Sequence, residues 1–206
     1  MTLYDIKPQF QSLLRPLVKR LAKAGTTANQ VTITAAVGSI VVGGVLTGFS
    51  HLEYLFLALP VWMFIRMALN AIDGMLAREF GQKSHLGAYL NEICDVISDT
   101  ALFLPFAFIA PFSDISVYLV IFLAMLSEFV GVLGLSVGAS RRYDGPIGKS
   151  DRALIFGVLG LWVGSGIAIP ESLFWIMPVL GILLSITIFN RIQSGLKEIQ
   201  FKRVDI

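Results

Sequence analysis

Asp and Asn side chains recur at helical spacing inside two strongly apolar stretches of this 206-residue sequence. Asn70 and Asp73 are three residues apart, and Asn91, Asp95 and Asp99 follow one another at steps of four. On α-helices each set lies on one face. Because only a short basic segment separates the two stretches, we expect antiparallel neighbouring helices whose polar faces meet. Ionisable groups in apolar helices are costly and usually mark a functional site.

The residue types in this group indicate a divalent cation. Asp and Asn offer oxygen donors only, and these suit hard ions such as Mg²⁺, Mn²⁺ or Ca²⁺. Both histidines, His51 and His85, lie in connecting segments, and Cys94 is the single cysteine. A zinc site and an internal disulfide are therefore not expected. The alternative is an interhelical polar network without a metal.

The composition is that of an integral membrane protein, with 55% hydrophobic and only 15% charged residues and a mean hydropathy of +0.76. Soluble domains are nearer one quarter charged. Apolar runs long enough to cross a bilayer predict an all-α fold, a single bundle of six transmembrane helices. The predicted helices span residues 29–49, 55–77, 86–111, 115–139, 151–169 and 173–193. We expect one membrane domain over residues 1–206.

Lys and Arg residues alternate with these predicted helices. They occur before the first and after the second, fourth and sixth, and the other three connections have none. The positive-inside rule then places both termini and the polar cluster in the cytoplasm. Residues 1–26 are too polar for a signal peptide and predict an amphipathic juxtamembrane helix, interrupted at Pro16, ahead of a six-span bundle over 27–206. Packing of this helix on the bundle is compatible with the same pattern.

The polar residues resemble the signature of the CDP-alcohol phosphotransferase family, D-x-x-D-G-x-x-A-R, eight residues, G-x-x-x-D-x-x-x-D. This chain reads Asn70-x-x-Asp73-Gly74-x-x-Ala77-Arg78, eight residues, Gly87-x-x-x-Asn91-x-x-x-Asp95. Asn thus stands at the first and third of the four Asp positions. Because Asn offers an oxygen without a charge, this variant is expected to bind divalent ions more weakly.

The resemblance implies a membrane enzyme, typically a homodimer, that transfers a substituted phosphate from a CDP-alcohol such as CDP-diacylglycerol to a second alcohol and releases CMP. It implies one or two Mg²⁺ or Mn²⁺ ions at Asn70, Asp73, Asn91 and Asp95, with Asp95 also the general base. It implies a nucleotide pocket formed by Gly74, Ala77, Arg78 and Gly87. The stretch TTANQVT resembles the family's PN-x-x-T and adds Asn29 and Thr32.

A second basic stretch, SRRYDGPIGKSDR, follows the fourth predicted helix. It supplies candidate acceptor-binding residues suited to an anionic group such as a phosphate, namely Arg141, Arg142, Lys149 and Arg152. The alternative is an ordinary positive loop at lipid headgroups. Glu92 and Asp99 are candidate auxiliary acids. Glu128 and Arg66 lie inside predicted helices, where they form a pair or find separate partners.

The sequence therefore predicts an enzyme of phospholipid biosynthesis in a bacterial cytoplasmic (inner) membrane. Its expected partners are a CDP-alcohol donor, a small alcohol acceptor with or without a phosphate, membrane lipids and a second copy of the chain, but no nucleic acid. The two Asn replacements motivate one alternative, a relative that binds CDP-lipid without turnover or regulates a true synthase. A small ion transporter is a weaker alternative, because the chain is short and has no inverted repeat.

Overall fold

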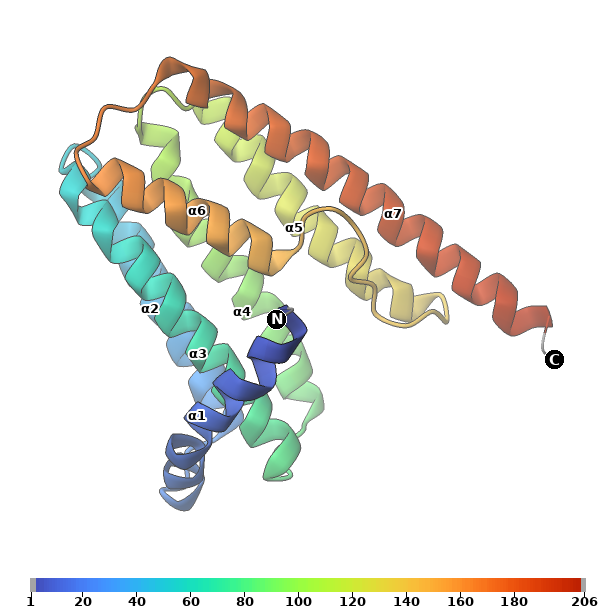
Figure 1. Cartoon of the computed structure of the whole chain (residues 1–206). Coiled ribbons are helices and arrows are strands. Elements are labelled where there is room, and N and C mark those ends of the chain that lie inside the picture. The colour runs from blue at the N-terminus through green and yellow to red at the C-terminus, as the bar shows by residue number, and fades with distance from the viewer. Residues whose placement is uncertain (1–2, 205–206) are drawn as a thin grey trace.

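The computed structural model describes residues 3–204, and within them the chain is all-α (Figure 1). The α-helices, in chain order, are α1 (Leu3–Lys23), α2 (Ala28–Gly48), α3 (Ala58–Glu79), α4 (His85–Phe103), α5 (Asp114–Ser136), α6 (Lys149–Gly164) and α7 (Ile176–Val204). Three short 3-10 helices adjoin them, η1 (Glu53–Leu57), η2 (Leu104–Phe108) and η3 (Glu171–Trp175).

The six predicted transmembrane helices are confirmed in part. A helix occupies each predicted position, and four segments are long and apolar enough to cross a membrane: Ala28–Gly48, Glu53–Glu79, Asp114–Ser136 and Glu171–Lys202. The helices α4 and α6 do not qualify, because α4 carries three carboxylates and α6 has 16 residues with charges in its first turn. The chain is an integral membrane protein by its four apolar helices.

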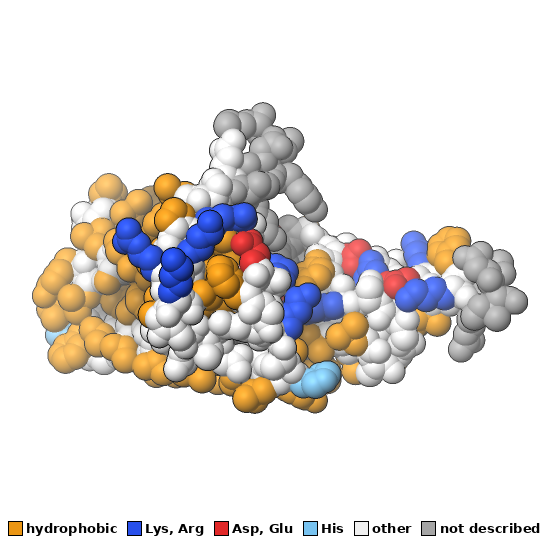
Figure 2. All heavy atoms as spheres, turned by 90° about the horizontal axis from the view of Figure 1, so that it is seen from below, with side chains coloured by type: hydrophobic (Ala, Val, Ile, Leu, Met, Phe, Trp, Pro, Cys, Tyr) orange, Lys and Arg blue, Asp and Glu red, His pale blue; other side chains and the backbone are white. Residues whose placement is uncertain are grey.

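Close helix packing holds α2 against both α3 and α4, and α5 against α7 (Figure 1). Gly43 permits the α2–α4 approach, because a Cβ at this position would overlap the backbone carbonyl of Ala101. The helix α6 lies against α3 and η1, and the C-terminal part of α7 projects beyond the rest of the bundle. Hydrophobic side chains cover much of the flanks, whereas Lys, Arg and a few acids gather on the face seen in Figure 2.

An aromatic core sets the positions of α4 and α6. The rings of Phe103 and Phe156 stack with centroids 3.8 Å apart, and Phe106 meets Phe156 edge to face at 5.2 Å. Asp99 lies one turn before Phe103 on α4, and Arg152 lies one turn before Phe156 on α6. The stacked rings therefore bring these two charged side chains to the same level of the bundle.

The predicted amphipathic helix is present as α1, although residues 1 and 2 lie outside the described part. It runs through Pro16 without the expected interruption. Val18 is fully buried in a cluster with Ile72 and Leu76, whereas Leu13 is 76% exposed. One apolar side of α1 thus packs on the bundle and another faces outward.

Candidate active site

The polar faces of α3 and α4 meet, as their helical spacing predicts. The Arg66 guanidinium donates to Asp99 Oδ1 at 2.6 Å and to Asp95 Oδ1 at 3.2 Å. Asn70 Nδ2 donates to the same Asp95 oxygen at 3.4 Å. Arg66 is 4% exposed and Asp99 is 6% exposed, whereas the Asp95 side chain is 19% exposed. The site thus has a buried ionic base and a partly open end at Asp95.

The start of α2 completes this side of the site. Thr27 caps the helix, and its hydroxyl accepts a hydrogen bond from the Gln30 amide. One turn on, the Thr32 hydroxyl donates to Asp73 Oδ2 at 2.8 Å. Gly87 of α4 faces Asn29, because a Cβ on Gly87 would lie 2.9 Å from Asn29 Oδ1. The structure therefore brings the TTANQVT segment against both halves of the sequence motif.

The remaining motif residues lie around this junction. Gly74 leaves room for Arg78 to fold back along α3, since a Cβ there would lie 2.8 Å from Arg78 Nη2. Arg78 is exposed and Ala77 is half-buried. Asn91 is exposed on α4, one turn before Asp95. These positions form a partly open surface beside the buried acids.

The loop before α6 and the first turn of α6 bring three of the four candidate acceptor residues to the acids. The Lys149 ammonium contacts Asp95 Oδ2. Arg152 Nη2 lies 3.1 Å from Asp99 Oδ2. The third contact joins Arg141 to Glu92, the candidate auxiliary acid, at 2.5 Å.

Arg142 does not contact the acids of this group, and its role in acceptor binding stays a prediction. Its guanidinium pairs with Asp144 at 2.9 Å and Glu198 at 2.7 Å, and Glu198 also accepts from the Ser140 amide. These contacts tie the loop to α7. The hydrogen bonds from Arg142 hold the pKa of the Asp144 carboxyl below its usual range.

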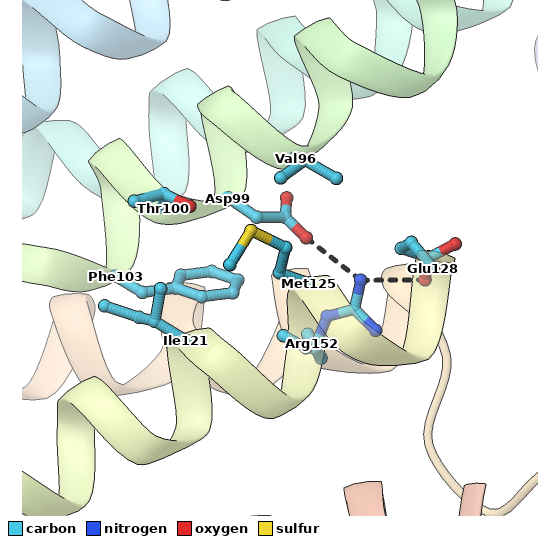
Figure 3. Close-up of a pocket in the computed structure, with 9 residues that line it drawn as sticks. Val96, Asp99, Thr100, Phe103, Ile121, Met125, Glu128 and Arg152 are labelled. Atoms are coloured by element: carbon cyan, nitrogen blue, oxygen red, sulfur yellow. Dashed lines mark hydrogen bonds and ion pairs between the residues drawn. The ribbon is translucent and has the colours of Figure 1, made fainter. Parts of the chain in front are cut away.

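Glu128 and Arg66 have separate partners, which is one of the two arrangements expected from the sequence. The Glu128 carboxylate lies 3.0 Å from Arg152, a contact drawn in Figure 3. It also lies 3.3 Å from Arg141 and 3.6 Å from Arg191. Arg191 lies at the polar end of the sixth predicted helix, 173–193, and no motif marked it as a site residue. In the structure α7 continues to Val204, and Arg191 is 2% exposed inside the bundle.

Arg191 also reaches two backbone carbonyls. It donates to the carbonyl of Ser127 and to that of Asp144, the latter at 3.3 Å. Gly145, next in the loop, has φ of +127°, and a Cβ there would lie 2.7 Å from Thr187. The loop that contains Asp144 and Gly145 therefore packs closely against α7 near Arg191.

The capacity of the site to bind a metal depends on oxygen donors. Within residues 3–204, no three His, Cys, Asp or Glu side chains form a metal-binding group. The four motif positions offer two carboxylates, Asp73 and Asp95, and two amides, Asn70 and Asn91. All four are oxygen donors, so they fit a hard divalent cation, with less charge than four carboxylates would supply.

Comparison with known proteins settles the family. Residues 25–187 match the sequence profile of CDP-alcohol phosphatidyltransferases. The chain belongs to this family. This CDP-alcohol phosphatidyltransferase family member is 49% identical to the inner membrane protein YnbA of Escherichia coli K12, over 95% of this chain and 97% of that one. It is 29% identical to the phosphatidylinositol phosphate synthase of Mycobacteroides abscessus, over 90% and 84% of the two chains.

Solved structures share the fold of this family member. The phosphatidylinositol phosphate synthase of Mycobacterium tuberculosis in complex with manganese and citrate aligns with a TM-score of 0.73 at 23% identity, covering 88% of each chain. The same protein with CDP-DAG bound aligns with a TM-score of 0.72 at 24% identity, covering 87% of this chain and 92% of that one.

Proposed function

We propose that this family member transfers a substituted phosphate, phosphatidyl from CDP-diacylglycerol, to an alcohol acceptor and releases CMP in phospholipid biosynthesis. The family match carries the reaction class. The observation that supports the site is the junction of α2, α3 and α4. There Asp73 and Asp95 lie beside a partly open surface, to which Asn29, Gly87 and Asn91 also contribute. A TM-score of 0.72 to a structure with CDP-DAG bound agrees with this donor.

Each residue has a distinct role in this proposal. Asp95 accepts the proton of the acceptor hydroxyl, since its carboxylate is partly exposed and a carboxylate within hydrogen-bond reach can act as a base. The Lys149 side chain is 32% exposed and flexible, so it can move away from Asp95 and let the acceptor hydroxyl contact that carboxylate. Arg66 holds Asp95 in place from the buried side. Asn29, Thr32, Gly74, Ala77, Arg78 and Gly87 form the cytidine side.

Asn70, Asp73, Asn91 and Asp95 are the proposed ligands of Mg²⁺ or Mn²⁺. When bound, such an ion neutralises the donor diphosphate and the charge on the leaving CMP. A manganese complex of the M. tuberculosis protein is consistent with this choice of ion. With two Asn at the site, we propose weaker binding than an all-Asp site would give.

The test is CMP release from CDP-diacylglycerol by the purified protein with Mg²⁺ or Mn²⁺. Glycerol, inositol and serine are offered as acceptors, each in turn, and then glycerol 3-phosphate and inositol phosphate. Asp95→Asn should abolish release. Asp114→Asn is the matched control, because Asp114 is exposed at the start of α5 and has no part in the site. Release that persists in Asp95→Asn would refute the role of Asp95.

One observation favours a second candidate, a relative that binds CDP-lipid without turnover. Both oxygens of Asp95 already have partners, Oδ1 with Arg66 and Asn70 and Oδ2 with Lys149. This candidate predicts binding of CDP-diacylglycerol without CMP release with any acceptor. The double variant Asn70→Asp/Asn91→Asp, which recreates the four-Asp signature, would then gain activity.

We propose a single membrane domain over residues 1–206 that acts as a homodimer, with both termini and the site on the cytoplasmic side of a bacterial inner membrane. Maleimide labelling of intact spheroplasts tests the orientation in a Cys94→Ala background. His51→Cys should react with an impermeant reagent, whereas Lys83→Cys should react only after lysis. The opposite pattern would invert the topology.

A further inference from the structure

The acceptor side of the site, formed by Arg141, Lys149, Arg152 and Arg191, is rich in arginine, but carboxylates offset most of its positive charge. Glu128 alone contacts three arginines, one from the loop, one from α6 and one from α7, at 3.0 to 3.6 Å. Arg152 and Arg191 are each 2% exposed, so water does little to screen these contacts. Both arginines therefore already form an ion pair with a carboxylate.

In the solvent-exposed part of the acceptor side, positive and negative charges are also paired. Its two cations, Lys149 and Arg141, have side chains 32% and 22% exposed. They contact Asp95 and Glu92, whose side chains are 19% and 29% exposed. A ligand that approaches Asp95 thus meets two positive and two negative groups together.

The same arginines nevertheless lack hydrogen-bond acceptors. Nη2 of Arg152 bridges Asp99 and Glu128, and its other two nitrogens point away from both (Figure 3). Those two nitrogens, Nε and Nη1, are buried without a partner, as is Nε of Arg141. Buried donors usually find an acceptor in a protein, a ligand or water. The cavity beside Arg152 and Glu128 has a volume of about 10 Å³, which is just enough room for one water molecule.

We propose that Glu128 makes the acceptor side selective for an uncharged polyhydroxy alcohol over a phosphorylated one. Glu128 offsets part of the positive charge of three arginines and so weakens their attraction for a phosphate. The exposed donors and carboxylates can still bind hydroxyl groups, which both donate and accept hydrogen bonds. This proposal rests on the proposed transfer reaction. Glu128 is a specificity-determining residue that acts through the arginines, not a catalytic one.

A phosphorylated acceptor would meet a specific obstacle here. To bind Arg141 or Arg152 through a phosphate, it must displace a carboxylate or sit next to it. Like charges placed together in a poorly hydrated site repel each other strongly. An uncharged polyol needs neither step, because a hydroxyl both donates and accepts.

The experiment compares matched acceptor pairs, inositol with inositol phosphate and glycerol with glycerol 3-phosphate, in wild type and Glu128→Gln. Wild type should use the neutral member of a pair at least about tenfold better in kcat/KM. Glu128→Gln should shift that ratio about tenfold or more toward the phosphorylated member. Glu198→Gln is the control, because it removes a carboxylate from Arg142, outside the acceptor group, and should leave the ratio unchanged.

A binding measurement separates this inference from the proposed reaction. Stabilisation by inorganic phosphate or glycerol 3-phosphate in thermal unfolding should be absent in wild type and present in Glu128→Gln. If wild type prefers or tightly binds the phosphorylated compounds, the inference is overturned while the reaction stands. If no acceptor supports CMP release, the proposed reaction fails, and the inference falls with it. If Glu128→Gln does not fold, the wild-type preference and binding decide alone.

Discussion

The pair of Arg66 and Asp99 offers the most quantitative test of the buried base of the site. Arg66→Met removes the guanidinium that pairs with two carboxylates, Asp99 at 2.6 Å and Asp95 at 3.2 Å. Removing one partner of a buried ion pair typically costs about 3–5 kcal/mol. Because Asp99 keeps Arg152 at 3.1 Å and Asp95 keeps Lys149, we expect the lower end, about 3 kcal/mol.

A double-mutant cycle isolates the pairwise interaction. In Arg66→Met/Asp99→Asn both charges are gone, so the loss of stability should be smaller than the sum of the single losses by about 2 kcal/mol. The assay is denaturant-induced unfolding in mixed micelles, followed by circular dichroism. The control cycle is Arg15 with Glu79, a pair at 3.0 Å whose side chains are 48% and 36% exposed. There the coupling should be about 0–1 kcal/mol.

The comparison between the two cycles decides the question. Coupling below about 0.5 kcal/mol at Arg66–Asp99 would mean that the two changes are additive. Water would then screen the pair as it does at the surface, and the description of this region as a buried ionic base would be refuted.

Two further predictions concern packing and pH. Gly43→Ala should destabilise the protein by roughly 1–3 kcal/mol or more, because its Cβ would overlap the carbonyl of Ala101. Gly44→Ala is the control, since a Cβ there meets nothing within 4 Å, and it should be neutral or stabilising by up to about 1 kcal/mol. Equal effects of the two variants in thermal unfolding would contradict the α2–α4 contact. The lowered pKa of Asp144 means that its contribution to stability is present above the unfolded pKa of about 3.9 and is lost as pH falls through the folded pKa. Between pH 6 and pH 3 wild type should therefore lose more stability than Asp144→Asn, and parallel curves would show that the Arg142 contact contributes nothing.

The sequence was sufficient to predict the helices and the contact between α3 and α4. Arg66, Asn70 and Asp73 share one stripe of a 22-residue apolar helix, and Asp95 and Asp99 share one stripe of the next. Helical periodicity alone aligns such residues. The same pattern predicts that the two polar stripes face each other, because the other surfaces of these helices are apolar and offer charged side chains no partners.

The acceptor side could not be predicted in the same way, because its order depends on a loop and on tertiary contacts. Arg141 and Arg142 are adjacent in the sequence, yet one turns to Glu92 and the other to Asp144 and Glu198. No periodic pattern distinguishes neighbouring residues of an irregular segment. The partners of Glu128 lie up to 63 residues away, and Arg191 belongs to no motif and lies where the last apolar run ends.

The charges that make α4 and α6 poor transmembrane helices on their own also explain how these helices join the bundle. Five basic side chains, Arg66, Arg141, Lys149, Arg152 and Arg191, contact four carboxylates, Glu92, Asp95, Asp99 and Glu128. A fifth carboxylate, Asp73, accepts a hydrogen bond from Thr32 in the same site. An unpaired charge in an apolar environment costs far more than a matched pair, so the balance itself is a condition of folding. Asp at positions 70 and 91 would add two negative charges that only further cations could offset. The two Asn residues and Glu128 therefore act on the same quantity, the net charge of the site, and that net charge is the physical basis of the acceptor preference that we propose.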